Sequence, residues 1–208
     1  PAGKTSTATV EASWPDAKLW WREDPHLYVL QTDLKPATGA ADRHIQRFGF
    51  RELWIEGISF VLNGTRVKIR SAWAGGAHGV MAAWPHWQPD KRLEAIWDWQ
   101  NQAIHERDVQ LSRTHNLDGV EEACDLADET GLLIKVEDAD VAQVNFTFDQ
   151  AYWNAALQHE LQVIDAYKNH PSVVMWSAGN ENMWGWIYQG EAAKTLGNRW
   201  QVKIARAM

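Results

Sequence analysis

The stretch HPSVVMWSAGNENMWGW, at His170–Trp186, ends a short apolar run with an amide and a carboxylate, Asn180 and Glu181. Two carboxyl groups that flank a glycosidic bond can hydrolyse it, one as proton donor to the leaving oxygen and the other as nucleophile or base. Glu181 suits the proton donor, because an apolar wall such as the indole of Trp184 raises the pKa of a carboxyl group. Two structural roles are equally open: Glu181 could cap the following helix or pair with Arg113.

Three other apolar runs also end in side chains that can take part in chemistry. In chain order, these ends carry Trp73 and His78, then Arg113 and His115, then Glu137 and Asp138. In a barrel of parallel strands the active site lies at the carboxyl ends of the strands. Since all four runs end in polar or aromatic residues, we expect these side chains to meet in one site.

Strand and helix patterns alternate through the second part of the chain. Strands are expected at 66–73, 109–115, 132–138 and 173–181. Helices are expected at 90–108, 118–131, 149–170 and 190–208. Four such units predict a parallel sheet with helices outside, either doubly wound or a (β/α)₈ barrel. No glycine-rich phosphate loop follows the first strand, which favours the barrel.

Apolar periodicity predicts the buried face of each helix. In the helix at 118–131 this face holds Val120, Ala123, Cys124 and Ala127, and Gly131 ends the helix. In the helix at 90–108 it holds Leu93, Ile96, Trp97 and Ile104. We interpret Cys124, the single cysteine, as a small buried side chain rather than a nucleophile.

The N-terminal part predicts strands only, at 6–12, 26–34 and 44–57. These are too few for a complete immunoglobulin-like sandwich, which needs about seven strands. Residues 1–58 are therefore expected to be the C-terminal part of such a domain, and residues 59–208 to begin a barrel domain. Between apolar runs, Asn63 and Gly64 predict a tight hairpin, because a type I′ turn needs two positive φ angles.

Composition narrows the possible partners. The 208 residues carry a formal net charge of −7, which argues against a nucleic-acid surface. No run is long enough for a membrane span, nothing resembles a signal peptide, and no compartment is indicated. The 14 tryptophans favour either core packing or stacking on sugar rings. His105, Glu106 and His115 lack the spacing of a zinc helix, so we expect neither a metal nor another cofactor.

Several segments resemble glycoside hydrolase family 2, which contains β-galactosidases, β-glucuronidases and β-mannosidases. NHPSVVMWSAGNE resembles the segment that carries the family's acid/base, and SRTHNLDGVEEACDLADETGLLIKVED resembles its second and third barrel segments. LWWREDPHLYVLQTDL and FGFRELWIEGISFVLNG resemble the end of its immunoglobulin-like domain and the hairpin before the barrel. The segments follow the family's order and cover nearly the whole chain.

This resemblance implies roles for individual residues. Glu181 would be the general acid/base, Asn180 would bind the sugar 2-hydroxyl, and Trp184 and Trp186 would form a sugar-facing wall. Arg113 would lie near the cleft floor, His115 would line the sugar subsite, and Glu137 or Asp138 would lie at the cleft wall. Two structural alternatives are open: Arg113 and His115 could belong to a buried ion pair that supports the strand ends, and Glu137 or Asp138 could be the partner of Arg113.

The resemblance also implies a fold: a β-sandwich remnant followed by a partial (β/α)₈ TIM barrel of four βα units. The family's nucleophile is a glutamate after the seventh strand, which no residue here matches, so we expect a retaining glycosidase fragment that is inactive alone. Its substrate would be a β-linked sugar, and the rest of a barrel or a second copy would cover its open edges. A non-catalytic carbohydrate-binding relative and a structural half-barrel are the alternatives.

Overall fold

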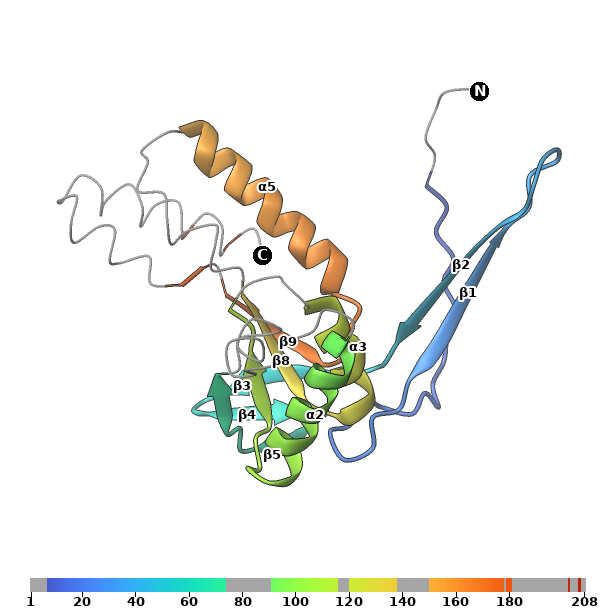
Figure 1. Cartoon of the computed structure of the whole chain (residues 1–208). Coiled ribbons are helices and arrows are strands. Elements are labelled where there is room, and N and C mark those ends of the chain that lie inside the picture. Colours follow the sequence, from blue (N-terminus) through green and yellow to red (C-terminus); the bar gives the residue numbers. More distant parts are fainter. Residues whose placement is uncertain are drawn as a thin grey trace.

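The computed structural model describes residues 7–73, 91–115, 120–137, 150–177, 179–180, 202 and 206. The described strands form three separate sheets: a two-stranded antiparallel sheet, a three-stranded antiparallel sheet and a four-stranded parallel sheet (Figure 1). Within these residues, no helix combines the length and hydropathy that crossing a bilayer requires.

An antiparallel hairpin forms most of the N-terminal part. Strands β1 (Tyr28–Leu34) and β2 (Asp42–Phe48) pair from Tyr28↔Phe48 to Leu34↔Asp42 and extend as an arm away from the parallel sheet (Figure 1). The strand expected at 6–12 is wrong for residues 7–12, which are exposed and have no strand partner. The strand expected at 44–57 is divided, because the chain leaves β2 at Gly49, where the backbone packs against Pro171.

A second antiparallel sheet follows the hairpin. It contains β3 (Leu53–Glu56), β4 (Ser59–Leu62) and β5 (Thr65–Val67) in that order. The predicted tight turn joins β4 to β5, with φ angles of 48° at Asn63 and 81° at Gly64. β3 pairs with β4 across the boundary that we expected at residue 58, and that boundary remains a prediction.

The strand expected at 66–73 is broken into two. β5 belongs to the antiparallel sheet, whereas β6 (Ser71–Trp73) belongs to the parallel one. The break lies at Arg70, whose backbone N–H donates to Oε1 of Gln110 (2.6 Å) and whose carbonyl accepts from the N–H of Gln110 (2.8 Å). With these hydrogen bonds the backbone leaves the antiparallel sheet after β5 and joins the parallel sheet at β6.

The predicted parallel sheet is confirmed, in the order β6-β7-β8-β9. Its further strands are β7 (Leu111–Arg113), β8 (Leu133–Glu137) and β9 (Val173–Ser177). The helices that alternate with them are α2 (Arg92–His105), α3 (Val120–Thr130) and α5 (Gln150–Tyr167). The helix expected at 190–208 lies outside the described residues except for Val202 and Arg206, whose backbone is helical.

Helix α3 buries the face that its sequence predicts. Val120, Ala123, Cys124 and Ala127 are all buried, and Gly131, with φ of +81°, ends the helix. The prediction for α2 is partly wrong, because Leu93 and Trp97 are 55% and 43% exposed. The buried face of α2 is instead centred on Gln100, whose amide donates to the carbonyl of Ala123 in α3 (2.8 Å).

The N-terminal part packs against the amino ends of the parallel strands. Trp20 is completely buried, and its indole N–H donates to the carbonyl of Asp128 at the end of α3 (2.9 Å). Trp20 packs in one cluster with Leu111 of β7 and Leu133 of β8. The residues that follow Trp20 pass over Gly131, where an added Cβ would lie 1.8 Å from the carbonyl oxygen of Arg22. The two parts therefore share a buried contact region around Trp20.

Candidate active site at the carboxyl ends of the parallel strands

A buried carboxylate lies at the carboxyl end of β8. Glu137 is only 2% exposed, and its Oε1 lies 3.5 Å from Nε of Arg113 and 3.4 Å from Nδ1 of His115. Arg113 ends β7 and His115 follows two residues later, so neighbouring parallel strands bring the three groups together. Burial of a carboxylate requires such partners, because an unpaired buried charge is unfavourable.

Thr114, which sequence analysis missed, fixes the carboxyl end of β8 to that of β7. Its hydroxyl accepts from the N–H of Glu137 (2.9 Å) and donates to the carbonyl of Glu137 (3.2 Å). Thr114 is 1% exposed. Its signal in the sequence is a hydroxyl between Arg113 and His115, since alternate residues of a strand face opposite sides.

This arrangement pairs Glu137 with Arg113 and His115. Its carboxylate faces two cationic or hydrogen-bonding side chains and has little access to solvent. The contact with Arg113 is the one expected in the alternative in which Glu137 is the partner of Arg113. The Nε of Arg113 is buried and makes no hydrogen bond in the described part of the chain, although the side chain as a whole is 32% exposed.

Asn180 reaches the same edge of the sheet. β9 pairs with β8 up to Glu137↔Ser177, so Asn180 follows three residues beyond the partner of Glu137. Between them the chain turns at Gly179, whose φ of 122° suits glycine, and the hydroxyl of Ser177 donates to the carbonyl of Gly179 (3.3 Å). Asn180 is partly buried.

The remaining predicted site residues are only partly described. Trp73 ends β6 and its backbone pairs with Arg113. His78, Asp138, Glu181, Trp184 and Trp186 lie outside the described residues. The structure therefore brings together Arg113, His115 and Glu137, with Asn180 on the adjacent strand end.

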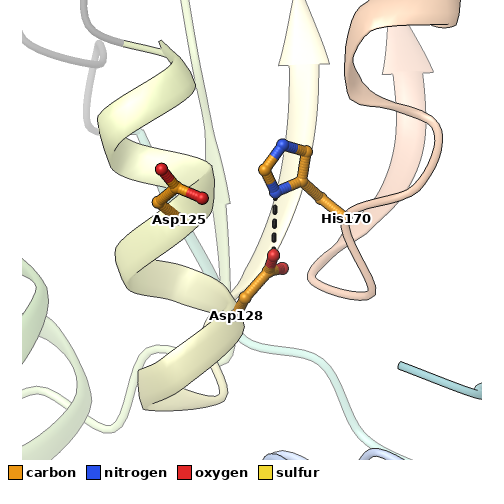
Figure 2. Close-up of side chains that lie close together, drawn as sticks. All are labelled: Asp125, Asp128 and His170. Carbon is orange, nitrogen blue, oxygen red and sulfur yellow. Dashed lines mark hydrogen bonds and ion pairs between the residues drawn. The ribbon is translucent and has the colours of Figure 1, made fainter. Parts of the chain in front are cut away.

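A second polar cluster lies at the opposite, amino end of β9. Figure 2 shows Asp125 and Asp128 on α3 facing His170, whose Nδ1 lies 2.8 Å from Oδ2 of Asp128. A cavity of about 270 Å³ adjoins these residues and is also lined by Arg47 of β2. The sequence patterns did not indicate this cluster. Its signal is Asp128, a charged residue that continues the apolar face of α3 one turn after Cys124.

One ligand atom from each of Asp125, Asp128 and His170 lies within 4.8 Å of the others, a spacing that a divalent cation could use. Each carboxylate, however, already has a partner. Asp125 accepts from Nη2 of Arg47 (2.7 Å), and Oδ1 of Asp128 accepts from the N–H and hydroxyl of Ser172 (3.0 and 2.6 Å). These contacts account for the cluster as a hydrogen-bonded network.

The protonation of two groups near this cluster is shifted. Burial lowers the pKa of His170, but the hydrogen bond to Asp128 and the charges of Asp128 and Asp125 outweigh it, so the pKa lies above its ordinary value. Burial raises the pKa of the Cys124 thiol well above its ordinary value, with the nearby charges acting in the same direction. A buried, protonated thiol is a poor nucleophile, in agreement with the packing role expected for Cys124.

Comparisons with known proteins identify the family. The model described as "Glycosyl hydrolases family 2, TIM barrel domain" matches residues 119–201, and the model described as "Glycosyl hydrolases family 2" matches residues 2–51. This chain belongs to glycoside hydrolase family 2. The predicted fold class, a β-sandwich remnant followed by a partial TIM barrel, is confirmed.

Similar proteins include several β-glucuronidases. The β-glucuronidase of Paenibacillus borealis is 30% identical in an alignment that covers 86% of this chain and 30% of that protein. The β-glucuronidase of Sus scrofa is 31% identical over 80% of this chain, which covers 26% of that protein. The structure of Bacteroides uniformis β-glucuronidase 3 matches with a TM-score of 0.68 and 27% identity, over 91% of this chain and 23% of that one. The family 2 chain thus spans less than a third of the length of these relatives.

Proposed function

We propose that this family 2 chain carries the acid/base half of a retaining glycosidase that acts on β-linked sugars. The observation that supports this most is the match of residues 119–201 to the family's TIM-barrel domain, because it includes Asn180 and Glu181. β9 delivers Asn180 to the edge of the sheet where Arg113 and Glu137 lie. In this proposal Glu181 is the general acid/base and Asn180 binds the sugar 2-hydroxyl.

A retaining mechanism also needs a nucleophilic carboxylate about 5 Å from the acid/base. Glu137 is poorly suited to this role, since it is buried and held by Arg113 and His115. We infer that the nucleophile is the seventh-strand glutamate of the family and is supplied outside these 208 residues. Arg113 and His115 then orient the strand ends, and Asp138, Trp184 and Trp186 line the sugar site.

We further propose β-glucuronides as the substrate class, because the relatives described above are β-glucuronidases. A test compares a full-length protein that contains this chain on aryl β-glucuronides and aryl β-galactosides, with product anomers followed by NMR. Faster release of β-glucuronic acid, with the β anomer formed first, supports the proposal. Faster hydrolysis of the galactoside would reassign the substrate, and an initial α anomer would contradict retention.

A non-catalytic carbohydrate-binding relative is the second candidate, supported by the 14 tryptophans. Aromatic faces hold sugars without any need for an acid/base. Calorimetric binding of a β-glucuronide by the full-length protein, without any hydrolysis over days, would favour this candidate over the glycosidase.

A further inference from the structure

The segment that leads into β9 is held from two sides. From α3, Oδ1 of Asp128 accepts hydrogen bonds from the N–H and the hydroxyl of Ser172. From the N-terminal part, Arg51 donates through Nε to the carbonyl of Pro171 (2.9 Å) and through Nη2 to the carbonyl of Val173. We call Asp128 and Arg51 the β9 clamp. The clamp grips three successive residues, 171–173.

The clamp is buried and preformed. Asp128 is 1% exposed and Ser172 is fully buried. His170 orients Asp128 by occupying its second oxygen, Oδ2 (Figure 2). Burial lowers the pKa of the Arg51 guanidinium, and the charge of Asp128 partly offsets this, so the two halves of the clamp also attract each other. The carbonyl of Ser172 in turn accepts from the N–H of Ile134 in β8 (2.7 Å), which links the gripped segment to the sheet.

Immediately after the clamp, the pairing of β9 with β8 is irregular. Ile134 pairs with Val173, but the next residue of β8, Lys135, pairs with Met175, so Val174 is an extra residue. A bulge of this kind changes the alignment of all the residues that follow it. If β9 slid by one residue along β8, its carboxyl end would move by about 3.3 Å. Each side chain of the strand would also turn to the opposite face of the sheet.

We propose that Asp128 and Arg51 are positioning residues that fix the register of β9 and thereby the place where Asn180 and Glu181 enter the active site. The catalytic part of this inference rests on the proposed glycosidase function. Within the described residues, both side chains contact the segment at the amino end of the strand, away from the carboxyl edge of the sheet. The N-terminal part of the chain thus takes part in the site through Arg51.

The chain contains a matched control for each residue of the clamp. Asp125 lies one turn before Asp128 on α3, and Arg47 precedes Arg51 by four residues. Asp125 and Arg47 form an ion pair with each other (2.7 Å), and neither makes a hydrogen bond or ion pair with residues 171–173, which the structure describes in full. Substituting them removes a charge from the same region while leaving the grip on β9 in place.

The test measures amide hydrogen exchange of β9 in the 208-residue chain and steady-state kinetics in a full-length protein that contains it. We expect Asp128→Ala and Arg51→Ala to accelerate exchange at residues 173–177 by tenfold or more, and Asp125→Ala and Arg47→Ala to leave it near wild type. We expect the clamp variants to lower kcat about 100-fold with KM within about threefold, because misplacement by 1 Å can cost that much. Asp128→Asn can keep the hydrogen bonds to Ser172, so we expect its β9 exchange rate and its kcat to lie close to those of the wild type.

Unchanged β9 exchange in both clamp variants, or equal acceleration in the control variants, would overturn the proposal. A rise in KM with kcat unchanged would overturn it as well. If Asp128→Ala does not fold, Arg51→Lys decides, since one ammonium cannot grip two carbonyls as the guanidinium does; wild-type exchange and kcat in that variant would count against the clamp. A full-length wild type without glycosidase activity would reject the proposed function, while the exchange measurement would still decide whether the clamp sets the register.

Discussion

Substitution of Gly131 by alanine should strongly destabilise this chain. Gly131 has φ of +81°, and a Cβ there would lie 1.8 Å from the carbonyl oxygen and 2.6 Å from the carbonyl carbon of Arg22. Such a contact with backbone cannot be relieved by rotating a side chain. The segment at Arg22 must move, and it carries Trp20, which is completely buried.

Gly64 provides the matched control. Its φ is also +81°, but no atom lies within 4 Å of the position of a Cβ there. Gly64→Ala should therefore lose only the conformational advantage of glycine, about 1–2 kcal/mol. Gly131→Ala should add the displacement of Trp20, for which removal of a buried aromatic side chain, about 3–5 kcal/mol, sets the scale. We expect Gly131→Ala to cost at least about 3 kcal/mol more than Gly64→Ala.

Urea unfolding of the 208-residue chain, followed by tryptophan fluorescence, measures this difference. Midpoints are compared at several protein concentrations, so that association of the chain is separated from its stability. A lower midpoint for Gly131→Ala than for Gly64→Ala, at an unchanged slope, supports the close contact between Gly131 and Arg22. Equal midpoints for the two variants would refute it, since the two glycines have the same φ angle.

Three further predictions follow from the described contacts. Glu137→Gln should destabilise the chain by about 3 kcal/mol in the same urea assay. This is the lower end for breaking a buried ion pair, because the side chain of Arg113 is 32% exposed. The control Glu129→Gln, which removes a half-exposed ion pair with Arg47, should cost less than about 1 kcal/mol. His170 faces Asp128, Asp125 and Arg47, and its pKa is raised in the folded chain. The stabilisation from its positive charge is therefore complete below about pH 6.5 and is lost as pH rises through the pKa of the folded state. The difference in unfolding free energy between wild type and His170→Ala should shrink from pH 6 to pH 9, and a constant difference would exclude this linkage. The exposed apolar side chains of the β1–β2 arm, including Val29 and Ile45 (65% and 58% exposed), predict that the isolated chain self-associates; sedimentation as a monomer at all concentrations would contradict this.

Local patterns predicted much of the fold because they act over a few residues. The type I′ turn at Asn63–Gly64 and the apolar face of α3 both follow from neighbouring residues, and both are confirmed. The break at Arg70 was not predictable in the same way, because it depends on Gln110, 40 residues later. The exposure of Trp97 likewise depends on Gln100 of α2 contacting α3.

In the candidate site, too, some features were predictable from the sequence and others depend on contacts between distant residues. Parallel strands place their carboxyl ends at one edge of the sheet, and this rule predicted that Arg113, His115 and Glu137 lie close together. The structure has them in contact. Sequence alone left the role of Glu137 open, and its burial could not be predicted because it depends on side chains from neighbouring strands. The β9 clamp was missed because Asp128 and Arg51 lie 77 residues apart and meet only through residues 171–173.

We propose Glu181 as the acid/base of a glycosidase, and a decisive test is how the rate loss in Glu181→Gln depends on the leaving group of the substrate. In a full-length protein that contains this chain, loss of a general acid should slow substrates with poor leaving groups by about 10²–10⁴-fold. Highly activated aryl glycosides need little protonation and should be slowed far less. Glu94→Gln, an exposed substitution on α2, is the control and should leave both rates unchanged. Equal slowing of activated and unactivated substrates by Glu181→Gln would contradict the assignment.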